Sequence, residues 1–381
     1  MKIGTRLVWY DQAPQDPYNP MSTPIYQTAT FEQENADRFG AFDYSRSGNP
    51  TRRVLEDQIA HLENGTRGFA FASGMAAIVA VLRLLHTGDE ILADSDLYGG
   101  TSRLFGSALS RGDIKIRFFD ATNPESLAEQ ITPATQLVYV ESPTNPLLRV
   151  ADIRRISEIV HARGSLLCVD STAMSPYLQN PLSLGADIVV HSGTKYLCGH
   201  SDVTAGLIAV RDDALANRLA FIQNAEGSAL GPFDSYLLLR GLKTLKLRLD
   251  AQEKSARKIV EFLKAHPGVK SVYYPGDADH PQYLLQKEQA RGAGSLLSFR
   301  VDSHEAAIKV AEKTRVIKIA VSFGSVNSTI SVPAKMSHAS VPQDHREYRE
   351  LPDDLLRLSV GAEDADDLLE DLANSMSILA D

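Results

Sequence analysis

Reactive side chains follow several apolar runs that are typical of buried strands. Asp170 ends the run 165–170, and Lys195 follows the run 187–191 within the segment His191-Ser192-Gly193-Thr194-Lys195-Tyr196. A lysine amine can form a Schiff base with a carbonyl, and a carboxylate can keep a ring nitrogen protonated. Because ligands of open α/β sheets bind at the carboxyl ends of the strands, the two residues are candidates for one site.

Groups suited to a phosphate lie at the ends of the same kind of strand. The segment Ser73-Gly74-Met75 follows the run 68–72 and opens a helix, so the N–H groups of Gly74 and Met75 can face an anion. The hydroxyls of Ser192 and Thr194 flank the lysine. Together with the lysine and the aspartate, these groups predict pyridoxal 5'-phosphate (PLP) as cofactor. Neither a dinucleotide-binding glycine fingerprint nor a Walker A sequence follows the first strand, which disfavours nicotinamide and nucleotide chemistry.

The elements that must position these groups alternate between strand and helix. Strands are predicted at 68–72, 90–93, 114–120, 136–141, 165–170, 187–191 and 206–210. Helices are predicted at 53–63, 75–85 and 152–162. Apolar strands without strict alternation, separated by helices, indicate a mainly parallel seven-stranded sheet that is covered on both faces.

The pattern changes near Gly231-Pro232. Residues 235–265 are predicted to form one long helix. Shorter strands follow at 269–274, 295–301, 316–321, 328–332 and 355–360, with helices at 303–313 and 365–379. The predicted fold is therefore an α/β large domain at 53–232 and a smaller α+β domain at 233–381. Residues 1–52, rich in proline and aromatic side chains, are predicted to be an arm that contacts a neighbouring subunit.

Composition narrows the class of protein. The 381 residues carry a formal net charge of −9, and the chain is 43% hydrophobic and 23% charged. These values indicate a globular protein and disfavour a nucleic-acid backbone as partner. Cys168 and Cys198 lack the spacing of a zinc site or a disulfide framework, so no metal is predicted. We expect a cytoplasmic protein because no apolar run is long enough for a membrane span and the first residues lack the apolar core of a signal peptide.

Several longer motifs resemble those of the Cys/Met-metabolism family of PLP-dependent enzymes, which has the aspartate-aminotransferase fold type. The resemblance covers nearly the whole chain. Its motifs are YSRSGNPT at 44–51, SGM at 73–75, DLYGGT at 96–101, ESPTNP at 141–146, VD at 169–170, HSGTKY at 191–196, GHSD at 199–202 and LRLSVG at 356–361.

The resemblance implies roles for the cofactor site. Lys195 would hold PLP as a Schiff base, and Asp170 would pair with the pyridinium nitrogen. Tyr98 would stack on the ring, and Asn145 would lie near the ring hydroxyl. The phosphate would be held by the glycine, methionine, serine and threonine assigned to it above.

The resemblance also implies substrate contacts and an assembly. Arg357 and Ser322 would bind the α-carboxylate of an amino-acid substrate, which suits the planar fork of arginine. Tyr44 and Arg46 would reach into a neighbouring subunit and complete its phosphate site. The implied assembly is a homo-oligomer, usually a dimer of dimers. The default for His200 and His338 is a structural role, and the sequence assigns no role to Tyr236.

Within the family, segments 223–234, 322–328 and 336–342 look most like cystathionine β-lyases, especially the plant type. The implied activity is α,β-elimination of L-cystathionine to homocysteine, pyruvate and ammonia. Lys195 would remove the Cα proton, and Lys195 or Tyr98 would protonate the departing sulfur.

Cystathionine or methionine γ-lyase and cystathionine γ-synthase remain alternatives on the same scaffold. Val321 stands where γ-lyase and γ-synthase relatives usually carry glutamate, and Gly100 stands where methionine γ-lyases typically carry cysteine. Two departures from the commoner family pattern bear on the substrate pocket: Ser171 in place of asparagine, and the segment 323–325 (Phe-Gly-Ser) in place of Leu-Gly-Gly.

Two further classes deserve comparison. An aminotransferase would share the fold, but the contexts of the YSRSGNPT arm and of Lys195 disfavour it. A catalytically inactive binding protein would not need Lys195, Asp170, Tyr98 and Arg357 together. A visible absorption band from bound cofactor would separate an enzyme of this kind from an inactive relative.

Overall fold

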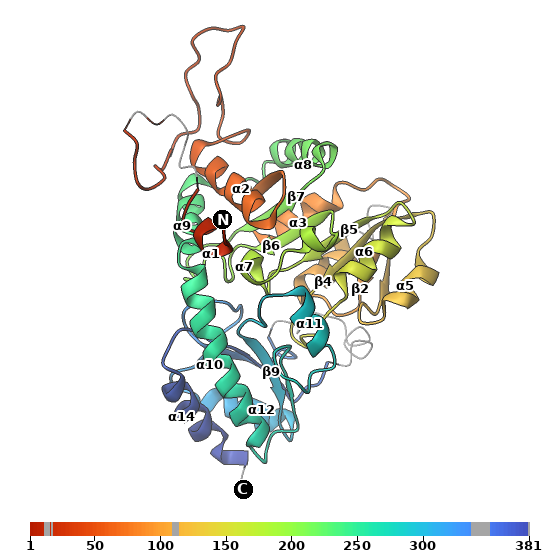
Figure 1. The fold of residues 1–381 in the computed structure, drawn as a ribbon, viewed down its shortest axis with the longest axis vertical. Helices are drawn as coiled ribbons and strands as arrows, with labels where there is room; N and C mark the ends of the chain where they lie inside the picture. The colour runs from red at the N-terminus through yellow and green to blue at the C-terminus, as the bar shows by residue number, and fades with distance from the viewer. Residues whose placement is uncertain (11–15, 17, 109–113, 337–350, 380–381) are drawn as a thin grey trace.

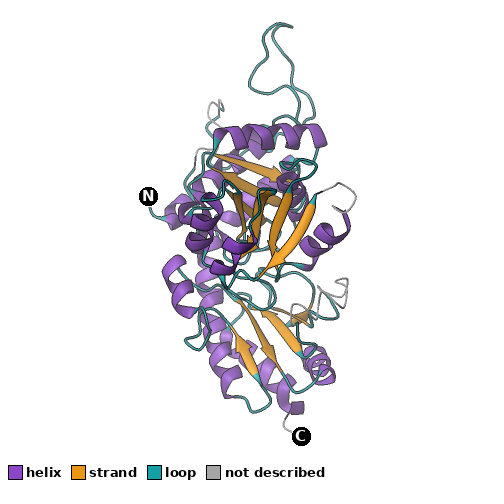
Figure 2. Ribbon diagram, turned by 90° about the vertical axis from the view of Figure 1, so that its right-hand side faces the viewer, coloured by secondary structure: helices purple, strands orange, loops and turns teal. Residues whose placement is uncertain are grey.

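The computed structural model describes residues 1–10, 16, 18–108, 114–336 and 351–379. The described residues form two sheets with helices packed around them, one sheet above the other (Figures 1 and 2). Among these residues, none of the helices combines the length and apolar character that crossing a membrane requires.

The larger sheet has seven strands, in the order β1-β7-β6-β5-β4-β2-β3. Their bounds are β1 Arg67–Phe71, β2 Glu90–Asp94, β3 Lys115–Phe119, β4 Thr135–Glu141, β5 Leu166–Asp170, β6 Ile188–Ser192 and β7 Gly206–Val210. Strand β7 runs antiparallel to β1 and β6, and the remaining neighbours are parallel. The predicted mainly parallel seven-stranded sheet is confirmed.

Helices cover both faces of this sheet, as alternate side chains of one strand show. Tyr139 of β4 belongs to the core that includes α3 and α8, whereas Val138 and Val140 belong to the core that includes α5 and α6. The helices concerned are α2 Pro50–Glu63, α3 Gly74–Leu82, α5 Pro124–Gln130, α6 Ile153–His161 and α8 Asp213–Glu226. Side-chain oxygens cap the N-termini of several helices: Ser73 accepts a hydrogen bond from the N–H of Ala76, which fixes the start of α3 next to β1.

The long helix predicted at 235–265 is wrong in one respect, because the structure has two helices there. Helix α9 covers Pro232–Leu242 and α10 covers Leu245–Ala265. The carbonyl of Gly241 accepts hydrogen bonds from the N–H of Thr244 at 3.2 Å and from the guanidinium of Arg248 at 2.9 Å. These bonds belong to a turn and a tertiary contact, so the α-helical ladder stops at this point.

The smaller sheet has five strands, in the order β10-β11-β12-β9-β8. Their bounds are β8 Ser271–Tyr273, β9 Leu296–Arg300, β10 Lys318–Ile319, β11 Thr329–Ser331 and β12 Leu355–Ser359, and α12 His304–Lys313 and α14 Ala365–Met376 accompany them. One continuous core includes Leu55 of α2, Leu249 of α10 and Phe299 of β9. Helix α10 therefore joins the two sheets through buried apolar contacts.

Shorter helices complete the described chain. They are α1 Ile3–Arg6, α4 Gly99–Arg103, α7 Ser175–Leu178 and α11 Tyr283–Gln289, with single turns of π- or 3-10 helix at Leu104–Ala108, Pro181–Leu184 and Ser377–Leu379.

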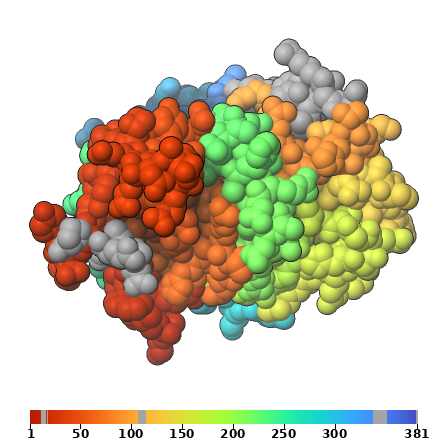
Figure 3. All heavy atoms as spheres, turned by 90° about the horizontal axis from the view of Figure 1, so that it is seen from above, coloured from red at the N-terminus to blue at the C-terminus, as the bar shows by residue number. Residues whose placement is uncertain are grey.

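Residues 18–49 form an extended arm that projects beyond α2 in Figure 1, and Figure 3 shows the same face of the molecule from above. Thr30 and Tyr44 form an antiparallel bridge that closes a loop of the arm. Large side chains such as Tyr18, Met21 and Phe39 are exposed, at 88%, 89% and 65%. Exposed apolar groups in this number are typical of a surface that another chain covers. The predicted domain boundaries remain a prediction.

Candidate active site

A cavity of about 420 Å³ lies at the carboxyl ends of β4, β5 and β6. Residues from both sheets line it, since β12 and the segment before β11 also contribute. Ten residues that the sequence assigns to a site line this cavity: Gly74, Met75, Tyr98, Asn145, Asp170, Ser192, Thr194, Lys195, Ser322 and Arg357. The chain thus brings groups that are far apart in sequence into one site.

Lys195 lies just after β6, and its amine faces the smaller sheet. Its Nζ donates a hydrogen bond to Oγ of Ser322 at 2.6 Å. Burial, reinforced by the positive charge of Arg357, lowers the pKa of Lys195 to about 8. The amine is therefore far more often neutral near physiological pH than an exposed lysine, which makes it a better base and nucleophile.

Asp170 is the last residue of β5 and is buried. Its carboxylate accepts hydrogen bonds from the hydroxyl of Tyr139 at 3.3 Å and from the N–H of Thr172 at 3.0 Å. Burial raises the pKa of Asp170 despite these bonds. Among the described residues, no lysine, arginine or histidine forms an ion pair with Asp170, so a cationic ligand atom can pair with this carboxylate.

The start of α3 and the end of β6 form a cup. A Cβ atom on Gly74 would lie 3.1 Å from Cβ of Ser192, so glycine allows the two segments to approach closely. The backbone N–H of Ser192 donates to Oγ1 of Thr172 at 2.8 Å. Among the described residues, the N–H groups of Gly74 and Met75 have no hydrogen-bond acceptor, as expected at a helix N-terminus. Such free donors suit a phosphate.

Arg357 of β12 is buried and lines the cavity from the smaller sheet. Its Nη1 donates to Oδ1 of Asn145 at 2.9 Å and its Nη2 donates to the carbonyl of Ser322 at 2.6 Å. Its Nε has no hydrogen-bond partner among the described residues. Burial lowers the pKa of Arg357 to about 10, so the guanidinium remains charged and can pair with a carboxylate ligand.

The structure adds residues that the sequence analysis missed. Glu141 ends β4, and its two carboxylate oxygens accept hydrogen bonds from the N–H of Tyr98 at 2.8 Å and of Asn145 at 3.0 Å. Burial and the neighbouring Asp170 raise the pKa of Glu141. Its place at a strand end was the available signal. Thr172 also lines the cavity, and its hydroxyl connects Asp170 to the backbone of Ser192 by hydrogen bonds. Nothing in the sequence marks this role.

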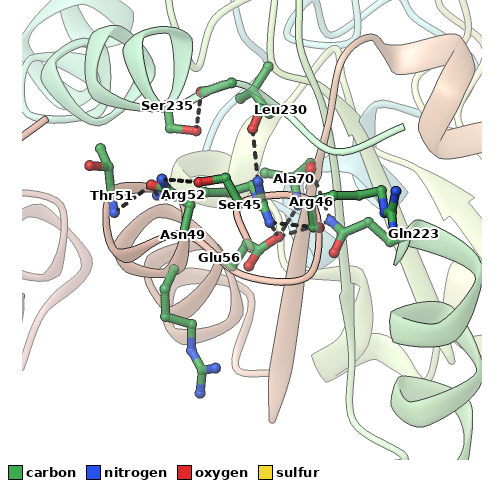
Figure 4. A network of polar contacts seen from close by, with 12 residues as sticks. Ser45, Arg46, Asn49, Thr51, Arg52, Glu56, Ala70, Gln223, Leu230 and Ser235 are labelled. Atoms are coloured by element: carbon green, nitrogen blue, oxygen red, sulfur yellow. Dashed lines mark hydrogen bonds and ion pairs between the residues drawn. The ribbon is translucent and has the colours of Figure 1, made fainter. Parts of the chain in front are cut away.

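Two predicted site residues lie outside this cavity. Arg46 is on the arm, just before α2 (Figure 4). Its Nε donates to Oδ1 of Asn224 at 3.2 Å, and its guanidinium lies 5.2 Å from the ring centroid of Tyr44. Neither Tyr44 nor Arg46 lines the cavity of its own chain. Both residues are therefore available to the cavity of another subunit.

His200 and Tyr236, for which the sequence assigns no functional role, do not line the cavity. His200 Nδ1 lies 2.7 Å from the carbonyl of Cys198, which fits a structural histidine. Tyr236 is half-buried on α9 and does not line the cavity. His338 lies outside the described residues. No cluster of side chains suited to a metal ion occurs in the described part of the chain.

The donor set fits the predicted cofactor. The cavity offers an amine of lowered pKa, a buried carboxylate without a cationic partner, and free N–H groups in a cup that a Cβ on Gly74 would narrow. These are the groups that an aldehyde, a pyridine nitrogen and a phosphate of PLP require.

Known proteins resemble the chain over almost its whole length. The model of the family described as "Cys/Met metabolism PLP-dependent enzyme" matches residues 4–377. The chain is 51% identical to chloroplastic cystathionine β-lyase of Arabidopsis thaliana over 97% of this chain and 80% of that one. It is 49% identical to cystathionine β-lyase MetC of Bacillus subtilis, over 94% and 92% of the two chains.

A solved structure shares the fold. Cystathionine γ-lyase from Lactobacillus plantarum, determined with L-serine, superposes with a TM-score of 0.96 at 42% identity and covers 100% of both chains. Because the family model matches nearly the whole chain and the cavity holds the groups that PLP requires, the chain belongs to the Cys/Met metabolism PLP-dependent enzyme family.

Proposed function

We propose that the chain is a PLP-dependent carbon–sulfur lyase that cleaves L-cystathionine by α,β-elimination. The observation that carries the proposal is the arrangement of Lys195, Ser322 and Arg357 in one cavity that Asp170 also lines. A base of lowered pKa beside a buried guanidinium is suited to removing the Cα proton of a bound amino acid. The names of the relatives from Arabidopsis and Bacillus support this substrate.

Each residue has a proposed task. Lys195 would hold PLP, and Asp170 would pair with its ring nitrogen. Tyr98 would cover the ring and Asn145 would lie beside it. Gly74, Met75, Ser192 and Thr194 would hold its phosphate. When bound, PLP supplies an electron sink for negative charge at Cα.

The side chains of the chain provide the rest of the mechanism. Arg357 would hold the substrate α-carboxylate, for which its unpartnered Nε is available. The neutral amine of Lys195 would then take the Cα proton, with the Ser322 hydroxyl orienting Nζ. Lys195 or Tyr98 would give a proton to the departing sulfur, so that homocysteine leaves as a thiol. Hydrolysis of the remaining three-carbon fragment yields pyruvate and ammonia.

Two positions favour β- over γ-elimination. Val321 lines the cavity and offers no carboxylate to the distal amine of a substrate. A Cβ on Gly100 would lie 2.4 Å from the ring of Tyr98, so a cysteine there would require that ring to move. The second candidate is a cystathionine γ-lyase, which the structural likeness to the Lactobacillus enzyme favours.

Product identification separates the candidates. The purified protein is incubated with L-cystathionine, and the keto acid and thiol are identified by mass spectrometry. Pyruvate with homocysteine is expected. Production of 2-oxobutyrate with cysteine would replace the β-lyase with a γ-lyase, and condensation of cysteine with an activated homoserine would indicate a γ-synthase.

Removal of the amine tests the central assignment. Lys195→Ala should lose the visible absorption band of bound PLP and all measurable turnover. Retention of both would show that another residue holds the cofactor.

We also propose that the active site is shared between subunits of a homo-oligomer, as a dimer of dimers. The exposed apolar side chains of the arm and the position of Tyr44 and Arg46 outside their own cavity support it. We propose a reducing compartment such as the cytoplasm, supported by the two buried free thiols of Cys168 and Cys198. Chloroplastic relatives show that the family is not confined to that compartment.

A further inference from the structure

A buried arginine lies at the root of the arm, in the first turn of α2. Arg52 is 2% exposed, and its guanidinium donates to the carbonyl of Arg46 at 3.1 Å and to the carbonyl of Leu230 at 3.2 Å (Figure 4). One side chain therefore ties the arm to a segment far along the chain. Two of its donors face backbone carbonyls, and the planar guanidinium fixes the directions of these donors more rigidly than a lysine ammonium would.

A largely buried carboxylate lies close to this arginine. Glu56 lies one turn later on α2, with its Oε1 3.6 Å from Nε of Arg52. The same oxygen accepts hydrogen bonds from the N–H of Ala70 at 3.0 Å and from Nε2 of Gln223 at 2.9 Å. The network thus fastens α2 to β1 and to α8, and buried networks of this kind hold one geometry.

The next residue on α8 binds the part of the arm that directly precedes α2. Asn224 accepts hydrogen bonds from Nε of Arg46 at 3.2 Å and from the hydroxyl of Ser47 at 3.4 Å. The backbone of Arg46 is therefore fixed by Arg52, and its side chain is fixed by Asn224. Both contacts are made within one chain, and neither lies at that chain's own cavity.

We infer that Arg52, with Asn224, is a positioning residue that presents Arg46 and Tyr44 to the cofactor phosphate of the neighbouring subunit. The inference rests on the proposed shared site and deepens it, because it assigns the residues that aim the arm. Arg52 would act on the partner's cavity and leave the cavity of its own chain intact.

A competing cause exists within the same chain. Ala70 of β1 lies three residues before Ser73, which opens the cup at the start of α3. The carbonyl of Ala70 accepts from the N–H of Leu230, whose own carbonyl accepts from Arg52. Loss of Arg52 would thus also disturb the start of α3 in its own chain. The experiment must therefore distinguish an effect on the cavity of the same chain from an effect on the cavity of the partner subunit.

The first measurement is cofactor affinity of single variants. Arg52→Gln removes two charged hydrogen bonds to carbonyls, so the dissociation constant of PLP, measured by equilibrium dialysis, should rise about tenfold. Asn224→Ala should raise it less, and this half-buried position serves as the second variant if Arg52→Gln fails to fold. Arg53→Gln is the matched control, because this arginine is exposed and, within the part of the chain that the structure describes, its ion pair is with Asp57 one turn away.

The second measurement is subunit exchange with Lys195→Ala. In a mixed dimer, the cavity of the Arg52→Gln chain has an intact lysine and receives an intact arm. Turnover is recorded against PLP concentration. A population of sites with wild-type half-saturation should appear, at about one quarter of wild-type activity, since half of the dimers are mixed and each has one complete site. The mixture of Tyr44→Ala with Lys195→Ala tests the shared site itself.

The outcomes are distinguishable. Suppose that the mixture of Tyr44→Ala with Lys195→Ala recovers activity, but that all active sites in the mixture of Arg52→Gln with Lys195→Ala still need the raised PLP concentration for half-maximal turnover. Arg52 then acts within its own chain and the inference is wrong, although the shared site stands. Wild-type PLP affinity in both single variants would also overturn it. If the Tyr44 mixture does not recover, the shared site fails and the inference falls with it.

Discussion

The amine of Lys195 is costly for the folded chain to bury. Its pKa is about 8 in the folded protein, against 10.5 for an ordinary lysine, because of burial and the nearby Arg357. Below pH 8 the amine is charged in both folded and unfolded chains, and the full cost is present. Between about pH 8 and 10.5 the unfolded chain keeps a proton that the folded chain has released, so this contribution to stability improves as pH rises.

Lys195→Met should therefore stabilise the cofactor-free protein below pH 8, by about 1–3 kcal/mol in the free energy of unfolding. The advantage should disappear as pH approaches 10.5. Urea unfolding of both cofactor-free proteins at several pH values measures it. A constant difference across that range would show that the charge of Lys195 is not the cause.

Glu141 supports two proposed cofactor contacts through the backbone. Glu141→Ala leaves the N–H groups of Tyr98 and Asn145 without their acceptor, so the free energy of unfolding should fall by about 2–4 kcal/mol. Glu141→Gln keeps one acceptor oxygen and should recover part of the loss. Chemical denaturation checks the order wild type, Gln, Ala, and equal stability of the two variants would contradict the double hydrogen bond.

At the scale of elements, the junction of α9 and α10 lies against the loop that carries Lys195. A Cβ on Gly241 would lie 2.3 Å from the carbonyl oxygen of Cys198, three residues after the lysine. Gly241→Ala should therefore destabilise the protein by about 1–3 kcal/mol and weaken PLP binding. Gly231→Ala, where nothing lies within 4 Å of an added Cβ, is the control and should change neither quantity. Thermal unfolding and cofactor titration of both variants decide the matter.

The elements that the sequence predicts well are those with local signals. Apolar runs bounded by turn residues predict all seven strands of the larger sheet, and Ser73 marks the start of α3 correctly. The break between α9 and α10 could not be predicted, because it depends on Arg248 and on the packing of Gly241 against another loop.

The site shows the same division. Lys195 and Asp170 stand at strand ends, where the fold class itself directs attention. Arg357 was identified through family resemblance, since nothing local distinguishes an arginine in an apolar strand. Glu141 and Thr172 act through hydrogen bonds to residues that only the folded chain brings near them.

At the scale of the whole molecule, the exposed apolar side chains of the arm are the surface through which we propose that subunits assemble. Met21→Glu should weaken assembly, because a charge replaces an exposed methionine in the surface that we propose another subunit covers. Sedimentation velocity at decreasing protein concentration should show smaller species than the wild type does. Leu284→Glu is the control, since this exposed leucine lies on α11, far from the arm in Figure 1. An unchanged assembly in Met21→Glu would place the interface elsewhere.

The cavity draws Lys195 and Asp170 from the larger sheet and Ser322 and Arg357 from the smaller one. A ligand that contacts all four residues connects the larger sheet to the smaller one. Cofactor and substrate should therefore protect the backbone around β12 from hydrogen exchange although neither is covalently attached there. The rate of deuterium uptake in the smaller sheet therefore reports how much of the cavity is occupied by ligand, without use of the PLP absorption band or of enzymatic turnover.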